Sequence, residues 1–298
     1  MMRIGVDFGG TKIEAAALND EGAFAARIRE PNPGSYDAAL ALVSDLITRV
    51  ETEAGPARSV GLAIPGSPSP RTGLIRNANS VYLNGRRFGQ DLAATLGRPV
   101  RLANDANCLA LSEAVDGAGA DAASVFGVIV GTGCGGGLVI DGKLVEGAHG
   151  VAAEIGHISL PWPAAEEAPG PACWCGLNGC LETWVSGTGF QRDHEATTGR
   201  AWKAQAVVEA ARSGDAGAAA ALARYIDRLG RMVAMVVNLV DPEVFVLGGG
   251  MSNVGELYER LPEVVARHAF SDHWGGRILA AKWGDSSGVR GAARLWSG

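Results

Sequence analysis

Basic stretches and long apolar runs are both missing from this chain of 298 residues. Its formal net charge is −6, and Lys and Arg nowhere cluster densely, which disfavours a surface for nucleic acid or for anionic membranes. The longest late apolar run, MVAMVVNLV, is too short to cross a bilayer, and the opening residues MMRIGVDFGG show no signal-peptide pattern. We therefore expect a cytoplasmic protein whose partners include neither nucleic acid nor a membrane.

Cysteine is also scarce, with five residues in the chain, yet three of them fall within PACWCGLNGCLE. Thiols stay reduced in the cytosol, so crowded cysteines there favour a metal site over disulfides. Cys173, Cys175 and Cys180 lack a fourth ligand for tetrahedral Zn²⁺, and His157 just upstream can supply it. The sequence therefore predicts a structural Cys₃His zinc site; the alternative is a group of reduced, partly buried thiols.

Glycine, by contrast, is abundant, with 43 residues that gather after apolar strands. A pattern of strand, glycine turn and hairpin begins at Ile4 and returns at Val125. Helical periodicity fills the intervals, for example over residues 35–55 and 220–240, where Asp241-Pro242 ends the second stretch. Alternating strands and helices predict an α/β protein built of two topologically similar halves, each with a mixed sheet.

Glycine turns follow apolar strands in DFGGTK (7–12), GTGCGGG (131–137) and LGGGMSN (247–253). Backbone N–H groups gathered by such turns can bind phosphate oxygens, although glycine also simply ends strands. The spacing of the second turn matches a dinucleotide fingerprint, but a hairpin follows it where that motif requires a helix. A G-x-x-x-x-G-K-[ST] phosphate loop is missing as well. These patterns favour a nucleotide held by hairpin turns.

DxGGTK, LxNDAN, GTGxGGG, ExGH and CxCGxxGCxE occur in this order and together resemble the ROK family of bacterial sugar kinases. The likeness covers essentially the whole chain. Stretches such as IPGSPSPRTGLIRNANSVYLNG resemble the bacterial fructokinases (manno-fructokinases) in particular, with N-acetylglucosamine kinases as near relatives.

The resemblance implies an actin/Hsp70/hexokinase-like (ribonuclease H-like) fold, in which duplicated mixed-sheet domains enclose an active-site cleft. The last helix of that fold commonly returns to the first domain. We therefore expect a small domain of residues 1–115 plus 286–298, and a larger domain of residues 116–285 that carries the zinc loop.

Asp7 ends the first strand beside the first glycine turn, where a carboxylate can hold Mg²⁺ near the terminal phosphates of ATP. Its alternative role is to cap the turn by hydrogen bonds, and the resemblance favours the metal role. The expected cofactor-binding residues are Asp7, Gly9, Gly10, Thr11, Lys12, Gly131, Thr132, Gly133, Cys134, Gly135, Gly248 and Gly249.

Asp105 in LANDAN stands where a strand passes into a helix, and we expect it to be the general base for a sugar hydroxyl. Asn104 and Asp105 are also good helix N-caps, and the resemblance favours catalysis for Asp105. The sugar-binding residues that the family implies are Gly66, Ser67, Asn79, Asn104, Asp105, Glu154, His157 and Glu182. The family usually has glycine at the position of Ala153, so a methyl group here can alter the backbone beside Glu154.

These residues predict an ATP-dependent hexose kinase that most plausibly converts fructose to fructose 6-phosphate. One alternative is an N-acetylglucosamine, glucose or mannose kinase of the same family. Another is a non-catalytic sugar sensor, which the intact Asp7 and Asp105 disfavour; a third is an actin-like ATPase, which the zinc loop disfavours. The family also suggests a homodimer.

Overall fold

The computed structural model describes residues 2–296. Contacts divide the chain into two compact units: unit 1 comprises Met1–Asp121, Gly137–Ala152 and Lys282–Gly298, and unit 2 comprises Ala122–Gly136 and Ala153–Ala281. The domain boundaries expected from the sequence remain a prediction. Across residues 2–296, every helix is too short or too polar to span a membrane.

Two mixed sheets repeat one strand order along the chain. The first runs β3-β2-β1-β4-β7 and the second β10-β9-β8-β11-β12. Their strands are β1 (Met2–Phe8), β2 (Lys12–Leu18), β3 (Phe24–Pro31), β4 (Ala57–Ile64), β7 (Arg101–Asn104), β8 (Ser124–Val130), β9 (Cys134–Ile140), β10 (Lys143–Leu144), β11 (Val244–Gly248) and β12 (Arg277–Ala280). The duplication predicted from the strand, glycine and hairpin pattern is confirmed by this order.

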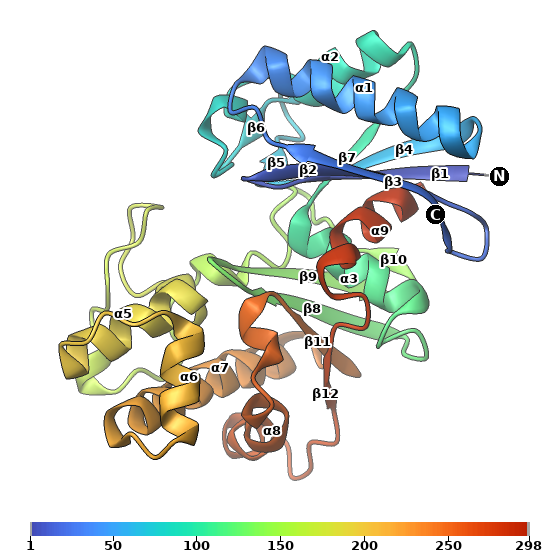
Figure 1. Cartoon of the computed structure of the whole chain (residues 1–298). Helices are drawn as coiled ribbons and strands as arrows, with labels where there is room; N and C mark the ends of the chain where they lie inside the picture. The colour runs from blue at the N-terminus through green and yellow to red at the C-terminus, as the bar shows by residue number, and fades with distance from the viewer. Residues whose placement is uncertain (1, 297–298) are drawn as a thin grey trace. The chain divides into compact units, whose positions relative to one another are not determined.

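In unit 1, helices cover both faces of the first sheet. α1 (Tyr36–Ala54) and α2 (Phe88–Leu96) lie on one face, and α3 (Asp105–Asp116) and α9 (Ser287–Arg294) lie on the other (Figure 1). α9 approaches the strands closely because they carry glycine: a Cβ on Gly5 would stand 1.9 Å from the carbonyl oxygen of Val289. The same holds for Gly61, where a Cβ would stand 2.0 Å from the carbonyl oxygen of Ala292. The middle of β1 therefore packs directly against the backbone of α9.

A buried carboxylate joins α3 to the segment that leads into α9. Glu113 accepts hydrogen bonds from the Ser287 hydroxyl at 2.9 Å and from the Lys282 backbone N–H at 3.0 Å. The side chain is fully buried, so these donors replace the water that an ionised carboxylate would otherwise need. α3, which begins at Asp105, is thereby fixed near its C-terminal end to the segment before α9.

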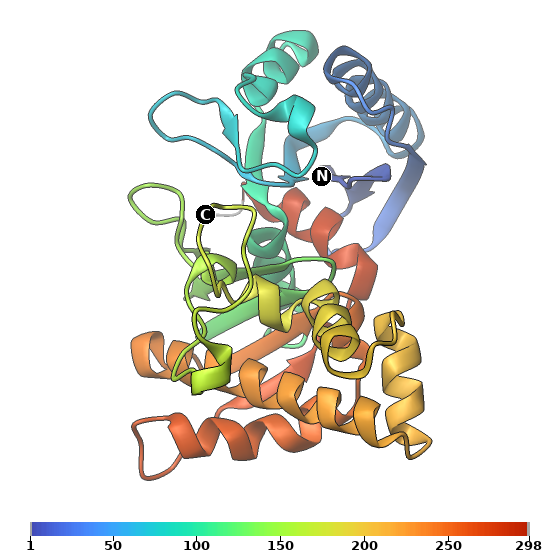
Figure 2. The same ribbon diagram turned by 90° about the vertical axis from the view of Figure 1, so that its left-hand side faces the viewer.

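In unit 2, α7 (Ala216–Val240) and α8 (Glu256–His268) pack together along one face of the second sheet (Figures 1 and 2). The shorter helices are α4 (Glu182–Val185), α5 (Gly187–Thr198) and α6 (Ala204–Arg212). The remaining short elements are β5 (Ser67–Pro68) and β6 (Ile75–Arg76) with the 3₁₀ turns η1 (Val81–Leu83), η2 (Ile155–His157), η3 (Ala165–Glu167), η4 (Gly250–Asn253) and η5 (Gly284–Ser286).

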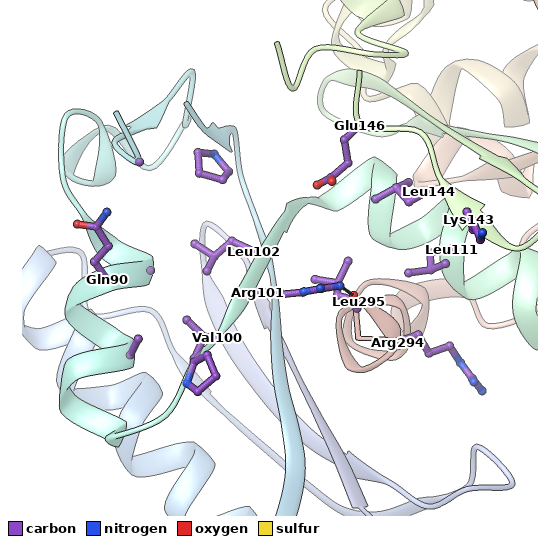
Figure 3. A pocket seen from close by; sticks show the side chains of 15 residues that line it. Gln90, Val100, Arg101, Leu102, Leu111, Lys143, Leu144, Glu146, Arg294 and Leu295 are labelled. Atoms are coloured by element: carbon purple, nitrogen blue, oxygen red, sulfur yellow. Dashed lines mark hydrogen bonds between the residues drawn. The ribbon is translucent and has the colours of Figure 1, made fainter. Parts of the chain in front are cut away.

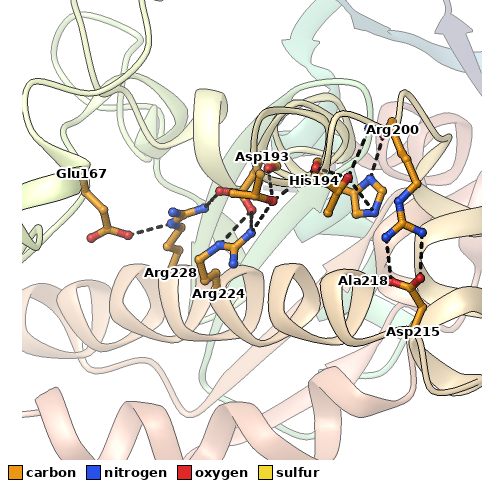
Figure 4. Close-up of polar contacts among 10 residues, drawn as sticks. Glu167, Asp193, His194, Arg200, Asp215, Ala218, Arg224 and Arg228 are labelled. Atoms are coloured by element: carbon orange, nitrogen blue, oxygen red, sulfur yellow. Dashed lines mark hydrogen bonds and ion pairs between the residues drawn. The ribbon is translucent and has the colours of Figure 1, made fainter.

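Buried charges anchor the Pro- and Ala-rich segment 160–172, which leads into the cysteine loop. Glu167 accepts hydrogen bonds from Arg228 at 2.7 Å and from Arg231 at 2.9 Å, both on α7. Arg228 also bonds to Asp193 of α5 at 2.7 Å (Figure 4). Burial alone would raise the pKa of Glu167, but hydrogen bonds from Arg228, a backbone N–H and Arg231 hold it below its usual value. The start of the cysteine loop is therefore fixed to the longest helix of unit 2.

We predict that Glu167→Gln lowers the free energy of unfolding by about 3 kcal/mol, because it leaves two buried guanidinium groups without their shared counter-charge. Urea denaturation measures the change. The matched control is Asp45→Asn, whose ion pair with Arg49 is exposed and should contribute less than about 1 kcal/mol. Equal, small effects of the two substitutions would contradict a stabilising role for the buried network.

Candidate functional site

Two carboxylates of unit 1 follow strands of one parallel set. Asp7 lies near the end of β1, and Asp105 follows β7 as the first residue of α3; β4 pairs in parallel with both strands. Asp7 keeps some contact with solvent, but burial of its carboxyl group raises its pKa to about 7, and the charges of Asp105 and Glu14 add to the rise. Asp7 and Asp105 are therefore close enough to repel each other.

Asn104 and Asp105 both accept a hydrogen bond at the start of α3, and the catalytic role of Asp105 remains a prediction. Asn104 is the N-cap of α3, and its side chain accepts a hydrogen bond from the Ala106 backbone N–H at 2.8 Å. Asp105 Oδ1 accepts from the same N–H at 2.8 Å, while its side chain stays exposed. The helix thus has its cap in Asn104, and Asp105 presents a carboxylate to solvent.

The first glycine turn, residues 9–12, is braced by a residue that sequence reasoning missed. Asn32 donates from its side chain to the carbonyl of Gly9 at 2.8 Å and from its backbone to the carbonyl of Thr11 at 2.9 Å. Its side-chain oxygen in turn accepts from the Tyr82 hydroxyl at 2.7 Å. The local sequence Pro-Asn-Pro-Gly signals only a turn, so nothing in it indicated this contact.

The sugar-binding candidates of unit 1 lie only partly together. The Asn104 side-chain nitrogen is 3.5 Å from the carbonyl oxygen of Gly66, and Ser67 follows in β5. Asn79 is exposed in the segment between β6 and η1, and its grouping with the others remains a prediction.

A cavity of about 320 Å³ in unit 1 opens beside Asn104. The Oδ1 atom of Asn107, on the cavity wall, is buried and has no hydrogen-bond partner among residues 2–296. Sequence reasoning did not single out Asn107, although it is the last residue of the LxNDAN motif. A buried acceptor without a partner is costly unless a ligand or water satisfies it.

The second and third glycine turns meet in unit 2. Gly249 has a φ of +82° and lies so close that a Cβ there would be 2.9 Å from the backbone nitrogen of Gly131. The second turn is held from α5: Gly187 donates to the carbonyl of Gly131 at 2.7 Å and the Thr188 hydroxyl to that of Thr132 at 2.9 Å.

These turns border a cavity of about 720 Å³, a size suited to a small-molecule ligand. Its walls come from both turns and from α5, α6 and η4: Gly131, Thr132, Gly187, Thr188, Gln191, Ala204, Gln205, Val208, Glu209, Arg212, Gly250, Met251, Asn253 and Val254. Sequence reasoning found the turns but missed the helical walls. The glycine pair in SGTG at the start of α5 was the one available signal.

Four residues of unit 2 form a cluster that can hold a metal ion. The ligand atoms of His157, Cys173, Cys175 and Cys180 all lie within 4.8 Å of one another. His157 presents Nδ1 to the Cys173 sulfur at 3.7 Å, and the sulfurs of Cys175 and Cys180 are 3.5 Å apart. A backbone N–H from Leu177 lowers the pKa of Cys175 to about 7, whereas burial raises the pKa of Cys173 and raises that of Cys180 to about 12. The sequence-predicted ligands are thus brought together.

Glu182 connects this cluster to the second glycine turn. One carboxylate oxygen accepts from the Cys134 backbone N–H at 3.0 Å, and the other accepts from the Trp174 indole N–H at 2.7 Å. Gly133 leaves room for this carboxylate, because a Cβ there would be 2.5 Å from its oxygen.

Ala153 adopts the backbone conformation that favours glycine. Its φ is +62°, and Glu154 follows it directly before η2. An L-residue in this region carries a strain of about 1–2 kcal/mol, so alanine at this position lowers the stability of the fold relative to glycine. The expected effect of alanine here is therefore local strain that leaves Glu154 and His157 in one short turn.

A further cavity of about 720 Å³ in unit 1 contains none of the predicted site residues (Figure 3). Arg101 and Leu102 of β7 and Leu144 of β10 line it, with Leu295 nearby (Figure 3). The Arg101 guanidinium bonds to the carbonyl of Leu295 at 2.7 Å, so its charge is partly satisfied within the chain.

Known proteins that resemble this chain match it over nearly its full length and belong to one family. The family model described as ROK matches residues 3–298. The chain is 41% identical to an N-acetyl-D-glucosamine kinase of Aliivibrio salmonicida, with 99% of each chain covered. It is 40% identical to the N-acetylgalactosamine kinase AgaK of a Shewanella species, with 100% of this chain and 97% of that one covered.

Solved structures agree with the fold. A ROK hexokinase from Thermus thermophilus superposes with a TM-score of 0.89 at 32% identity, covering 99% of this chain and 97% of that one. A ROK-family glucokinase from Streptomyces griseus, in complex with glucose and AMPPNP, superposes with a TM-score of 0.80 at 29% identity, covering 99% of each. The hexokinase-like fold predicted from the sequence is confirmed by these neighbours.

Proposed function

The chain belongs to the ROK family, and on this premise we propose that it is an ATP-dependent kinase of N-acetylated hexosamines, first of all N-acetylglucosamine. Two relatives at 40–41% identity are named for kinases of N-acetylglucosamine and N-acetylgalactosamine. Fructose, the first substrate predicted from the sequence, has no support among the relatives reported above. The alternative amino-sugar substrate takes its place.

Asp105 is the general base of the proposed reaction, and its exposed carboxylate at the start of α3 is the observation that carries the proposal. It accepts the proton of a sugar hydroxyl as that oxygen attacks the γ-phosphorus of ATP and the bond to the departing ADP breaks. Asn104, fixed as the N-cap, orients the same sugar through its side-chain amide. Glu154, His157 and Glu182 remain predicted sugar contacts.

ATP is proposed to bind through the glycine turns. Backbone N–H groups of turns 9–12 and 131–135 suit phosphate oxygens, and the cavity of about 720 Å³ beside Gly131 suits the nucleoside. Mg²⁺ would be held at Asp7, where two repelling carboxylates form a negative site that a divalent cation fits. When bound, it neutralises charge on the phosphates.

Zinc is proposed for the Cys₃His cluster. Three sulfurs and one imidazole nitrogen within 4.8 Å of one another fit a tetrahedral zinc site. A closed shell of four protein ligands leaves no position for a reacting group, so the ion would supply structure to the loop.

The acetamido group gives the amino sugars their distinguishing chemistry, and the cavity beside Asn104 is proposed to receive it. The unpaired Oδ1 of Asn107 is an acceptor that suits the N–H of that group. Glucose and fructose carry a hydroxyl or a carbonyl at this carbon, which leaves the cavity unfilled. Selectivity would then come from an acetamido group that fills the cavity and donates its N–H to this buried acceptor.

We expect sugar-dependent ADP release to be greatest with N-acetylglucosamine. A panel of N-acetylglucosamine, N-acetylgalactosamine, glucose, mannose and fructose should give a kcat/KM at least about 100-fold higher for the first than for fructose. A preference for fructose would restore the original prediction. Absence of ADP release with every sugar would instead favour a non-catalytic sensor.

Asp105→Asn should lower kcat by about 10²- to 10⁴-fold, because the amide cannot accept the hydroxyl proton. Calorimetric titration should still detect sugar binding, since the amide keeps the side chain's shape. A variant that retains kcat within tenfold of the unsubstituted enzyme would remove Asp105 from the role of base.

Asn107→Ala should reduce kcat/KM for N-acetylglucosamine by about 10-fold or more, because the acetamido N–H loses its acceptor. The matched measurement is glucose with the same variant, for which kcat/KM should change less than about threefold. An equal loss for both sugars would mean that Asn107 serves the fold of α3 and not the acetamido group.

A further inference from the structure

Trp174 lies between two ligand cysteines and is held in place although its side chain is exposed. Its indole N–H donates to Glu182 at 2.7 Å, and its ring meets the imidazole of His157 edge-on, with ring centres 4.9 Å apart. The side chain is 64% exposed, so burial does not account for its position. The position of this exposed tryptophan is therefore set by a charge-assisted hydrogen bond and a ring contact.

The partner of Trp174 reaches the second glycine turn. The other carboxylate oxygen of Glu182 accepts a hydrogen bond from the Cys134 backbone N–H at 3.0 Å. The carboxylate rests against Gly133, where a side chain would displace it. The indole N–H and a backbone N–H inside GTGCGGG are therefore bonded to the two oxygens of one carboxylate.

We propose that Trp174 is a positioning residue that couples the Cys₃His loop to the phosphate-binding turn, so that loading the loop with metal raises affinity for a nucleoside triphosphate. A metal that gathers His157 and the cysteines fixes the indole; the indole fixes Glu182; and Glu182 fixes the Cys134 N–H. The inference rests on the proposed function for the role of the turn. The link itself stands on the contacts above.

The coupling is separable from the folding of this region. The Thr183 hydroxyl donates to the carbonyl of Cys180 at 2.7 Å, and the buried Tyr225 hydroxyl donates to that of Val185 at 2.9 Å. These bonds hold the backbone on both sides of Glu182 without its side chain. Replacing the exposed indole by phenylalanine therefore removes one N–H donor and leaves α4 anchored.

The test compares Trp174→Phe with Trp162→Phe, a half-exposed tryptophan of the same unit whose indole is outside the link. Each protein is loaded with Co²⁺, whose thiolate absorption bands report an intact Cys₃His site. Hydrogen exchange of a peptide covering residues 131–137 then reports the Cys134 N–H, and titration with AMPPNP without sugar gives nucleotide affinity.

Trp174→Phe should keep the Co²⁺ spectrum, raise exchange at Cys134 about 10-fold and weaken AMPPNP binding about 5- to 10-fold. Chelator-treated unsubstituted protein should show the same faster exchange, and Trp162→Phe should behave as the unsubstituted protein does. Normal exchange in Trp174→Phe, or loss of its Co²⁺ bands, would overturn the coupling. Failure of the unsubstituted protein to bind AMPPNP would instead refute the proposed function, while the exchange result still decides the link.

Discussion

Burial of the Asp7 carboxyl group, with the charges of Asp105 and Glu14 nearby, is the constraint on which the candidate site of unit 1 depends. Ionised Asp7 opposes folding: its pKa is about 7 in the fold against 3.8 for the free group, so this cost grows as pH rises from about 4 to about 7. The fold keeps the two carboxylates together because β1 rests on α9 without intervening side chains and α3 is tied to the α9 segment through Glu113. A divalent cation bound there, as proposed above, would neutralise the ionised Asp7, so that cation binding and stability would be linked.

Much of this arrangement could be predicted because its signals are local. The glycine turns follow their strands directly, and the repeated pattern of strand, turn and hairpin predicted the duplicated strand order. The Cys₃His cluster was predictable for a similar reason: its three cysteines lie in one loop and its histidine lies just upstream. The motif allowed either Asn104 or Asp105 to be the N-cap of α3, and the backbone geometry identifies Asn104.

Other features depend on contacts between distant residues and leave no signal in the sequence. Asn32 braces a turn some twenty residues earlier in the chain, and Glu167 meets arginines on a helix that begins much later. The helical walls of the nucleotide-sized cavity come from α5 and α6, which look like ordinary amphipathic segments. Ala153 is intermediate: the departure from glycine is visible in the sequence, but its positive φ is not.

The identity of the sugar is the property that short sequence motifs predict least well. The motif residues expected to meet sugar hydroxyls indicate the reaction, but the motif says little about the substituent at one carbon of the sugar. What discriminates is whether a buried polar atom is left without a partner when the wrong sugar is bound. Asn107 belongs to the motif by type, yet its unpaired oxygen exists only once α3 and the 145–150 loop are folded around one cavity. The proposed selectivity would thus depend on packing in unit 1, whereas the proposed phosphoryl transfer depends on residues of short local motifs.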